Sequence, residues 1–206
     1  MKEEIIYIGD PMCSWCYGMV NELDKLMSKY QDRFPFRTVV GGLRPYETQP
    51  MDQKMRDFLK DHWQEVHTRT QQPFDFRLLE SAKGFVYNTE KPCRAIVTVR
   101  HFIPEKAHAY FKAIQSAFYA KAIDITQDEV LIETAKSLGI NPIDFNTYFQ
   151  KESTRKETYD DFTWAQQIGV TGFPSVILSY NQELFALALG YRTFEDMDEI
   201  IRKIID

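Results

Sequence analysis

Short apolar runs near both ends of the chain enclose a long middle part in which apolar residues recur at helical spacing. Residues 5–8 are continuously apolar and predict a buried strand, and residues 36–40 predict a second strand. Between them, from about Cys13 to Tyr30, apolar residues return every three or four positions. A strand, a helix and a strand in this order form a βαβ unit, so the two strands are expected to be parallel.

The middle of the chain, from roughly residue 46 to residue 168, has a helical pattern throughout. Within it, residues 126–129 have the sequence of a capping box, which predicts a helix start. Asn141-Pro142 predicts another helix start, because proline fits the first helical position. The pattern therefore predicts several consecutive helices in this block and no strand.

The last part of the chain returns to strands. Residues 175–180 and 183–189 are apolar and flank Asn181-Gln182, which predicts an antiparallel hairpin. A final helix, capped by Thr193, is expected to reach residue 204. The pattern alone therefore predicts an α/β or α+β protein with a long helical segment.

Composition narrows the class of protein. The 206 residues are 44% hydrophobic and carry a net charge of −5, with no basic stripe, which argues against nucleic acid and anionic membranes as main partners. No apolar run approaches 18 residues, and the chain does not begin with a secretory pattern. If residue 1 is the natural start, a cytoplasmic location is expected.

The candidate chemistry lies between the first strand and the first helix, in Cys13-Ser14-Trp15-Cys16. Two cysteines three positions apart on a helix lie one turn apart, so they can form a disulfide with little backbone movement. Cys13 would lie at the helix N-terminus, where unpaired N–H groups and the helix dipole favour a thiolate.

A C-x-x-C pair also occurs in zinc sites, which need four ligands, usually supplied by a second pair. The other cysteine, Cys93, forms no such pair with the four histidines, His62, His67, His101 and His108. A strand that leads directly into the pair at a helix start favours a redox dithiol instead.

Two motifs together resemble a known family. Residues 10–18, Asp-Pro-Met-Cys-Ser-Trp-Cys-Tyr-Gly, resemble the active-site motif of the DsbA-like thioredoxin-fold family, and within it the cytosolic FrnE-like dithiol oxidoreductases. Residues 169–175, Gly-Val-Thr-Gly-Phe-Pro-Ser, resemble the family's cis-proline loop and are called the proline loop below. The resemblance implies a thioredoxin fold with a large helical insertion.

The resemblance also implies domain boundaries. Residues 1–45 and 169–206 would form the thioredoxin-like domain, and residues 46–168 would form the inserted helical domain. The last inserted helix, at about 155–168, would pack back on the thioredoxin sheet.

The roles of the site residues follow from the same resemblance. Cys13 would attack a substrate disulfide, and Cys16 would resolve the mixed disulfide that forms. Ser14 and Trp15 would tune the redox potential and contact substrate. In the proline loop, a cis bond before Pro174 would turn the Phe173 backbone toward an extended substrate.

Three residues need separate interpretation. Tyr7 stands six residues before the first cysteine, where thioredoxins and DsbA carry a buried acid that handles the proton of the resolving thiol. The nearest acid is Asp10, which either accepts protons or caps the loop. Cys93 is interpreted as a small buried residue, as free cysteines usually are.

The resulting hypothesis is a thiol–disulfide oxidoreductase, an enzyme of the disulfide oxidoreductase or isomerase type. Its only cofactor would be its own dithiol, with glutathione as a candidate electron partner and protein or small-molecule disulfides and thiols as substrates. One alternative is a glutathione-dependent transferase or isomerase of the kappa type, which has serine at the first cysteine position. Another is a non-enzymatic soft-metal module that uses Met12, Cys13 and Cys16. The natural substrate, the direction of electron flow and the oligomeric state stay open.

Overall fold

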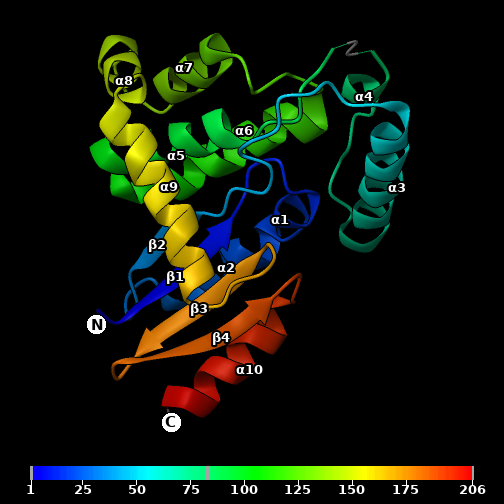
Figure 1. Cartoon of the computed structure of the whole chain (residues 1–206). Coiled ribbons are helices and arrows are strands. Elements are labelled where there is room, and N and C mark those ends of the chain that lie inside the picture. The colour runs from blue at the N-terminus through cyan, green and yellow to red at the C-terminus, as the bar shows by residue number, and fades with distance from the viewer. Residues whose placement is uncertain (1, 82–83, 206) are drawn as a thin grey trace.

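A four-stranded sheet lies at the centre of the computed structural model, which describes residues 2–81 and 84–205 (Figure 1). Its strands are β1 (Glu4–Gly9), β2 (Phe36–Val40), β3 (Ser175–Tyr180) and β4 (Glu183–Leu189). They lie side by side in the order β2-β1-β3-β4. Strands from the two ends of the chain therefore meet at the centre of one sheet.

The register of the sheet agrees with the predicted topology. β1 and β2 are parallel, with Ile5 opposite Phe36, and this confirms the expected βαβ unit. β3 runs antiparallel to β1 and to β4, so the predicted hairpin is confirmed as well. Its turn residues Asn181 and Gln182 have positive φ values of 49° and 66°, as a tight turn between twisted strands requires.

Ten α-helices and one short 3-10 helix are described. They are α1 (Ser14–Gly18), α2 (Val20–Tyr30), α3 (Gln53–Thr70), α4 (Arg77–Ser81), α5 (Glu90–Phe102), η1 (Pro104–Lys106), α6 (Ala107–Lys121), α7 (Asp128–Ser137), α8 (Pro142–Phe149), α9 (Glu152–Gln167) and α10 (Phe194–Ile205). The helices α3 to α9 come from the part of the chain that was predicted to be helical. This order, with strands before and after a long helical segment, confirms the α/β thioredoxin fold with a helical insertion.

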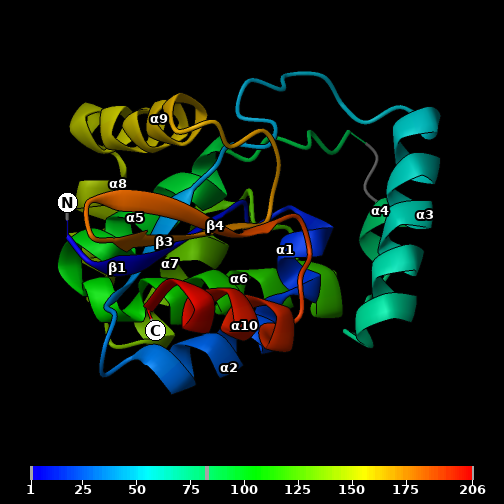
Figure 2. The same ribbon diagram turned by 90° about the horizontal axis from the view of Figure 1, so that it is seen from below.

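Helices cover both faces of the sheet (Figure 2). On one face, Ile6 and Ile8 of β1 form a small apolar cluster with Ala165 of α9. On the opposite face lie α2 and α10, which also contact each other. Tyr7 points to this second side, because side chains alternate along a strand, and it belongs to the main core.

The main hydrophobic core does not stop at the sheet. The same buried cluster joins Ile5 and Tyr7 of β1 to Phe111 and Phe118 of α6. The division into residues 1–45 plus 169–206 and residues 46–168 stays a prediction, and the two predicted parts share this core.

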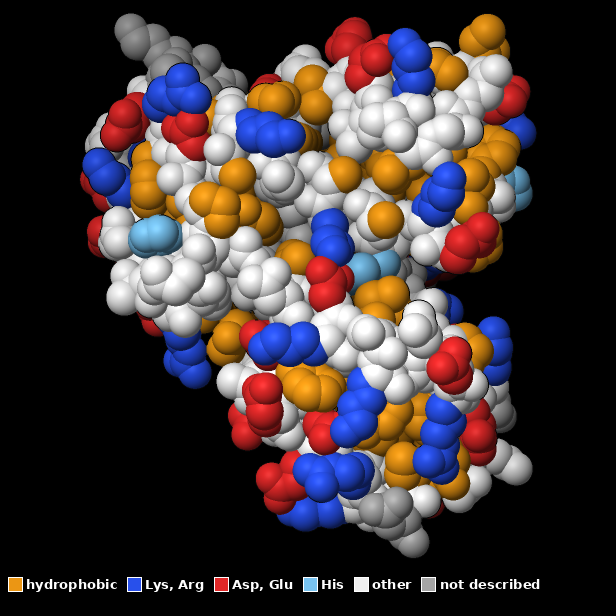
Figure 3. Space-filling view, turned by 180° about the vertical axis from the view of Figure 1, so that it is seen from behind, with side chains coloured by type: hydrophobic (Ala, Val, Ile, Leu, Met, Phe, Trp, Pro, Cys, Tyr) orange, Lys and Arg blue, Asp and Glu red, His pale blue; other side chains and the backbone are white. Residues whose placement is uncertain are grey.

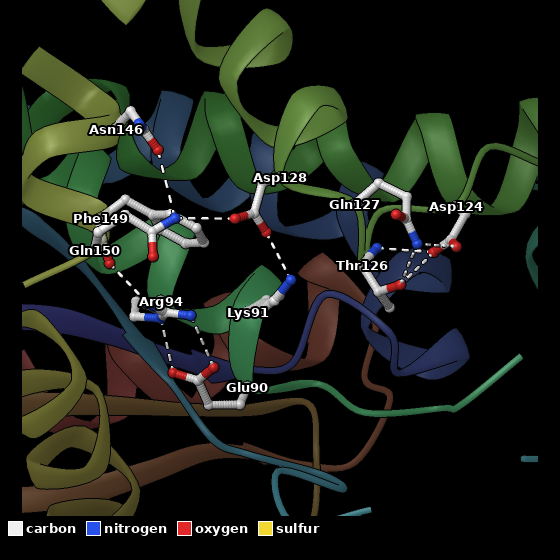
Figure 4. A network of polar contacts seen from close by, with 10 residues as sticks. All are labelled: Glu90, Lys91, Arg94, Asp124, Thr126, Gln127, Asp128, Asn146, Phe149 and Gln150. Carbon is white, nitrogen blue, oxygen red and sulfur yellow. Dashed lines mark hydrogen bonds and ion pairs between the residues drawn. The ribbon is translucent and has the colours of Figure 1, made fainter. Parts of the chain in front are cut away.

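Polar contacts fix the inserted helices to one another (Figure 4). The buried Arg94 side chain of α5 pairs with Glu90 at 2.8 Å and donates a hydrogen bond to the Phe149 carbonyl at the end of α8. Lys91, which follows Glu90 in α5, pairs with Asp128 of α7 at 2.7 Å. Because Arg94 is buried, loss of Glu90 would leave its positive charge unpaired in the protein interior, which would strongly lower the stability of the fold.

Two helix boundaries differ from the prediction. The helix expected from about Cys13 to Tyr30 is interrupted at Met19, so α1 and α2 are separate. A side chain at Gly18 would lie 2.8 Å from Val66 of α3, so glycine at this position allows the two helices to approach closely. The predicted capping box is wrong, because the Thr126 hydroxyl donates to Asp124 and does not cap α7.

The surface carries mixed charge. On the face in Figure 3, acidic and basic side chains are interspersed and neither sign forms a continuous field. None of the helices within residues 2–81 and 84–205 is long and apolar enough to cross a bilayer.

Candidate active site

The two cysteines of the motif lie where β1 leads into α1. Cys13 has an extended backbone and occupies the N-cap position of α1, and Cys16 lies one turn into that helix. The Cys13 N–H donates to the Asp10 carbonyl at 3.0 Å, and the Cys13 carbonyl accepts from the Tyr17 N–H at 3.1 Å. Backbone hydrogen bonds therefore fix Cys13 on both sides. Neither Cys13 nor Cys16 is in a disulfide.

The two thiols differ in their access to solvent. Cys13 is 7% exposed, whereas Cys16 is fully buried. Burial raises the pKa of the Cys16 thiol well above its ordinary value, and the neighbouring Cys13 raises it further. The Asp10 backbone N–H and the Tyr7 hydroxyl oppose this increase. A substrate would therefore reach Cys13 first.

The proline loop faces the first cysteine, although 160 residues separate the two in the chain. The Cys13 thiol donates a weak hydrogen bond to the Phe173 carbonyl oxygen at 3.5 Å. The peptide bond between Phe173 and Pro174 is cis. The Ser175 hydroxyl donates to the Gly172 carbonyl at 2.9 Å and thus holds the loop in shape.

The glycines after β2 make room for the proline loop. A side chain on Gly41 would begin 2.1 Å from a ring atom of Phe173, and one on Gly42 would begin 2.9 Å from the Phe162 ring. The sequence indicated these glycines only as the end of a strand. Their second property, the close approach of two rings, depends on residues 120 or more positions away and has no local signal.

Asp10 joins two loops beside the dithiol. Its buried carboxylate accepts hydrogen bonds from the Met12 N–H at 2.8 Å and the Leu43 N–H at 2.6 Å. Burial raises the pKa of Asp10, and hydrogen bonds from Leu43, Met12, Thr89 and Cys93 oppose the increase. These hydrogen bonds agree with the predicted capping role of Asp10, and its proton-accepting role stays a prediction.

Cys93 lies under the same carboxylate. It is fully buried, and its thiol donates to Asp10 at 3.5 Å. Burial raises the pKa of Cys93 well above its ordinary value, and the charge of Asp10 adds to this. Burial agrees with the interpretation of Cys93 as a small buried residue, but its contact with Asp10, 83 positions away, was not foreseen.

The structure adds residues that the sequence did not indicate. The buried Tyr87 hydroxyl donates to the Met12 carbonyl, directly before Cys13. The Thr89 hydroxyl accepts from the Arg44 N–H at 3.1 Å. A cavity of about 400 Å³ opens beside them, between residues 44–52 and α3, with Tyr87 in its wall. Tyr87 has no sequence signal, because nothing in residues 84–89 resembles a motif.

The outer side of the motif carries a small aromatic cluster. Trp15, partly exposed, lies 5.8 Å from the Tyr191 ring, between ring centroids. The exposed Arg69 guanidinium of α3 lies 5.9 Å from the Trp15 ring and 5.2 Å from the Tyr191 ring. Ser14 is also partly exposed. These side chains form a rim beside Cys13 to which three distant segments contribute.

The four histidines contact residues other than the two cysteines. His62 packs on Phe58, His101 stacks on Tyr148, and His67 bonds the Gln72 carbonyl. His108 packs against the Tyr7 ring and lies 3.6 Å from Asp24. In the part of the chain that the structure describes, no group of three or more His, Cys, Asp or Glu residues could hold a metal ion.

Comparison with solved structures found proteins whose fold is similar over nearly the whole chain. A provisionally assigned protein disulfide isomerase from Nitrosomonas europaea is 33% identical, with a TM-score of 0.90 over 98% of this chain and 97% of that one. The cytosolic disulfide reductase DsbM from Pseudomonas aeruginosa is 24% identical, with a TM-score of 0.80 over 98% of each chain. The same reductase in a structure with GSH has a TM-score of 0.78.

A solved structure of lower sequence identity belongs to an enzyme with another activity. A 2-hydroxychromene-2-carboxylate isomerase is 15% identical, with a TM-score of 0.67 over 97% of this chain and 93% of that one, and so shares the fold alone. A comparison with curated proteins found no match. The model of the DSBA-like thioredoxin domain matches residues 4–202. The chain belongs to the DSBA-like thioredoxin domain family.

Proposed function

We propose that this protein is a cytoplasmic thiol–disulfide oxidoreductase that works through the dithiol of Cys13 and Cys16. The observation that carries the proposal is the unequal access of the two thiols. Cys13, the more exposed of the two, lies at a helix start, and the fully buried Cys16 lies one turn behind it. Such a pair suits an attacking thiol and a resolving thiol.

The reaction has two exchange steps. In the reducing direction, the Cys13 thiolate attacks a substrate disulfide, so a mixed disulfide forms and one substrate thiolate leaves. Cys16 then attacks the Cys13 sulfur, which forms the Cys13–Cys16 disulfide and releases the second substrate thiol. Two electrons pass from the dithiol to the substrate. The oxidising direction uses the same steps in reverse.

The proline loop would hold the substrate next to the reacting sulfur. The Phe173 carbonyl oxygen lies 3.5 Å from the Cys13 sulfur, so a peptide joined to Cys13 would run beside this backbone. Extended peptides bind to free backbone groups in this way, and side-chain pockets add specificity. Trp15 and Ser14, on the exposed side of the motif, would contact the substrate from the other side.

Glutathione is the proposed electron partner. Support comes from the similar fold of a disulfide reductase solved with GSH. Within this chain, the Arg69 guanidinium lies over two aromatic rings beside the motif, where it could bind a carboxylate of the tripeptide.

Equilibration in glutathione redox buffers tests the function. Wild type should convert between dithiol and Cys13–Cys16 disulfide over a defined range of buffer potential, and Cys13→Ser and Cys16→Ser should not. A protein that shows no such transition would not be a dithiol oxidoreductase. Metal analysis under reducing conditions and an assay for glutathione transfer would then separate the two alternatives. Met12, a ligand of the metal alternative, is fully buried in the main core.

A further inference from the structure

The Cys16 thiol must lose its proton, but the position that carries a buried acid in the resembling proteins holds a tyrosine in this chain. Cys16 must become a thiolate in a site from which water is excluded, and burial opposes that charge. The tyrosine at the acid position is Tyr7. The buried acid Asp10 already accepts hydrogen bonds from Met12, Leu43 and Cys93.

The Tyr7 hydroxyl is buried without a regular partner. Tyr7 is 1% exposed, and its hydroxyl has no hydrogen bond of standard geometry to any residue within 2–81 and 84–205. Its ring is fixed by Phe111 at 5.4 Å and His108 at 5.9 Å, between ring centroids. The hydroxyl is therefore held in one place and is available to pair with charge that appears near it.

Gly9 keeps the space that the hydroxyl occupies. Tyr7 and Gly9 lie on the same face of β1, two residues apart. A side chain on Gly9 would begin 2.4 Å from the Tyr7 hydroxyl oxygen and 2.6 Å from the ring carbon that carries it. The ring therefore lies along the strand toward the end that leads to the dithiol.

We infer that the Tyr7 hydroxyl donates a hydrogen bond to the Cys16 thiolate in the resolving step and is a catalytic residue of this protein. The inference rests on the proposed dithiol function. Burial raises the pKa of the Tyr7 hydroxyl well above its ordinary value, and the nearby Cys16 adds to this. Tyr7 therefore keeps its proton and acts as a donor only, unlike an acid that takes up the proton.

The step balances without another reagent. The Cys16 sulfur forms a bond to the Cys13 sulfur, and the bond between Cys13 and the substrate sulfur breaks. The electron pair leaves with the substrate sulfur, and the proton lost by Cys16 ends on that sulfur through solvent. Tyr7 lowers the energy of the intermediate charge, because a hydrogen bond to a charged group is stronger than one to a neutral group.

Three other titratable groups lie near Tyr7 and Cys16. Cys13 comes from α1, Asp10 from the loop after β1, and His108 from α6. Of these, His108 contacts the Tyr7 ring and is paired with Asp24, and Asp10 acts on Cys16 through its backbone N–H. A change in the pH profile on loss of the hydroxyl can therefore be assigned to the Tyr7–Cys16 pair if these three groups are left intact.

The reaction of the reduced protein with Ellman's reagent separates the two steps on one absorbance trace. In a Cys93→Ser background, the first release of thionitrobenzoate reports attack by Cys13, and its rate depends on reagent concentration. The second release reports resolution by Cys16 and is independent of concentration. Tyr7→Phe should leave the first phase within twofold. It should slow the second at least tenfold, which is about 1.4 kcal/mol in the barrier. It should also move the pH profile of the second phase to higher pH.

Two further variants make the result specific. Tyr110→Phe removes another buried hydroxyl, one that donates to the Leu131 carbonyl in the helical insertion, and should leave both phases unchanged. Gly9→Ala should displace the Tyr7 hydroxyl and slow the second phase. A second phase in Tyr7→Phe with the rate and pH profile of its parent would overturn the inference, as would equal slowing of both phases. A parent protein with no second phase would instead overturn the proposed dithiol function.

Discussion

The sulfur of Cys13 lies 3.5 Å from the carbonyl oxygen of Phe173, although 160 residues separate them in the chain. The first residue belongs to the start of α1, and the second belongs to the loop before β3. β1 and β3 are neighbours in the sheet, so the loops at this edge are brought together. The candidate site therefore depends on correct sheet assembly as well as on the local C-x-x-C motif.

Gly41 tests whether the position of Phe173 matters for exchange. Gly41→Ala would place a methyl group 2.1 Å from the Phe173 ring, so the ring and its backbone must move. We expect at least a tenfold lower rate of insulin disulfide reduction and a loss of about 1–3 kcal/mol in the free energy of unfolding. The rate is measured by turbidity and the stability by urea unfolding.

The matched control lies in the proline loop itself. Gly172→Ala adds the same methyl group at a position where nothing lies within 4 Å. It should keep reduction close to the wild-type rate. Equal losses in both variants would show that the loop tolerates no change, and the specific role given to Phe173 would then be wrong.

Cys93 should be dispensable for the exchange chemistry. It is buried, and its thiol donates to Asp10, a hydrogen bond that a serine hydroxyl can replace. Cys93→Ser should therefore reduce insulin at a rate near that of wild type. A tenfold loss, about 1.4 kcal/mol in the barrier, would make Cys93 part of the mechanism.

The Arg69 side chain should select for anionic substrates. Arg69→Gln removes a guanidinium beside Trp15 and Tyr191, and we expect about a threefold to tenfold slower reaction with glutathione disulfide at low salt. Reaction with the neutral hydroxyethyl disulfide should not change. Arg33→Gln removes an exposed guanidinium that lies over Phe34, after α2, and serves as the charge-matched control. Equal effects on both disulfides would argue against carboxylate recognition by Arg69.

The contact between α2 and α10 predicts a pH dependence of stability. The Asp198 carboxylate accepts from Lys29 at 2.5 Å and from Tyr30 at 2.7 Å. Burial opposes ionisation, but these hydrogen bonds and the nearby charges lower the pKa of Asp198 below its usual value of 3.8. The stabilisation is therefore present above about pH 4 and is lost as the pH falls through the lowered value.

Asp198→Asn measures this contribution. It should lower the free energy of unfolding by about 1 kcal/mol at pH 7 and by much less at pH 3. Asp160→Asn breaks an exposed pair with Lys156 and should have little effect at either pH. An Asp198 variant as stable as wild type at pH 7, or an equal loss at pH 3, would contradict this assignment.

Local sequence patterns predicted the framework well. The apolar strands, the hairpin at Asn181 and the helical middle each follow from residues close in sequence, and the structure has them. Neither the break at Met19 nor the loss of the capping box at Thr126 follows from the local pattern. A side chain added at Gly18 would lie 2.8 Å from Val66 of α3, and the Thr126 hydroxyl donates to Asp124.

Local sequence patterns predicted less of the candidate site, because its residues come from distant parts of the chain. The C-x-x-C motif indicated Cys13 and Cys16, but only a family resemblance joined them to Phe173. The contacts of Tyr87 with Met12 and of Cys93 with Asp10 cross 75 and 83 positions, and neither has a motif. The space at Gly9 for the Tyr7 hydroxyl likewise becomes visible only in three dimensions.

The most direct measurement is to trap the mixed disulfide and map its cysteine. Cys16→Ser, expressed in cells, should accumulate disulfide adducts with proteins or glutathione, seen on non-reducing gels. Mass spectrometry should place them at Cys13, because attack by Cys13 is intact and resolution is blocked. Cys13→Ser should accumulate none. Adducts at Cys93, or adducts that persist in Cys13→Ser, would contradict the assignment of Cys13 as the attacking thiol and Cys16 as the resolving thiol.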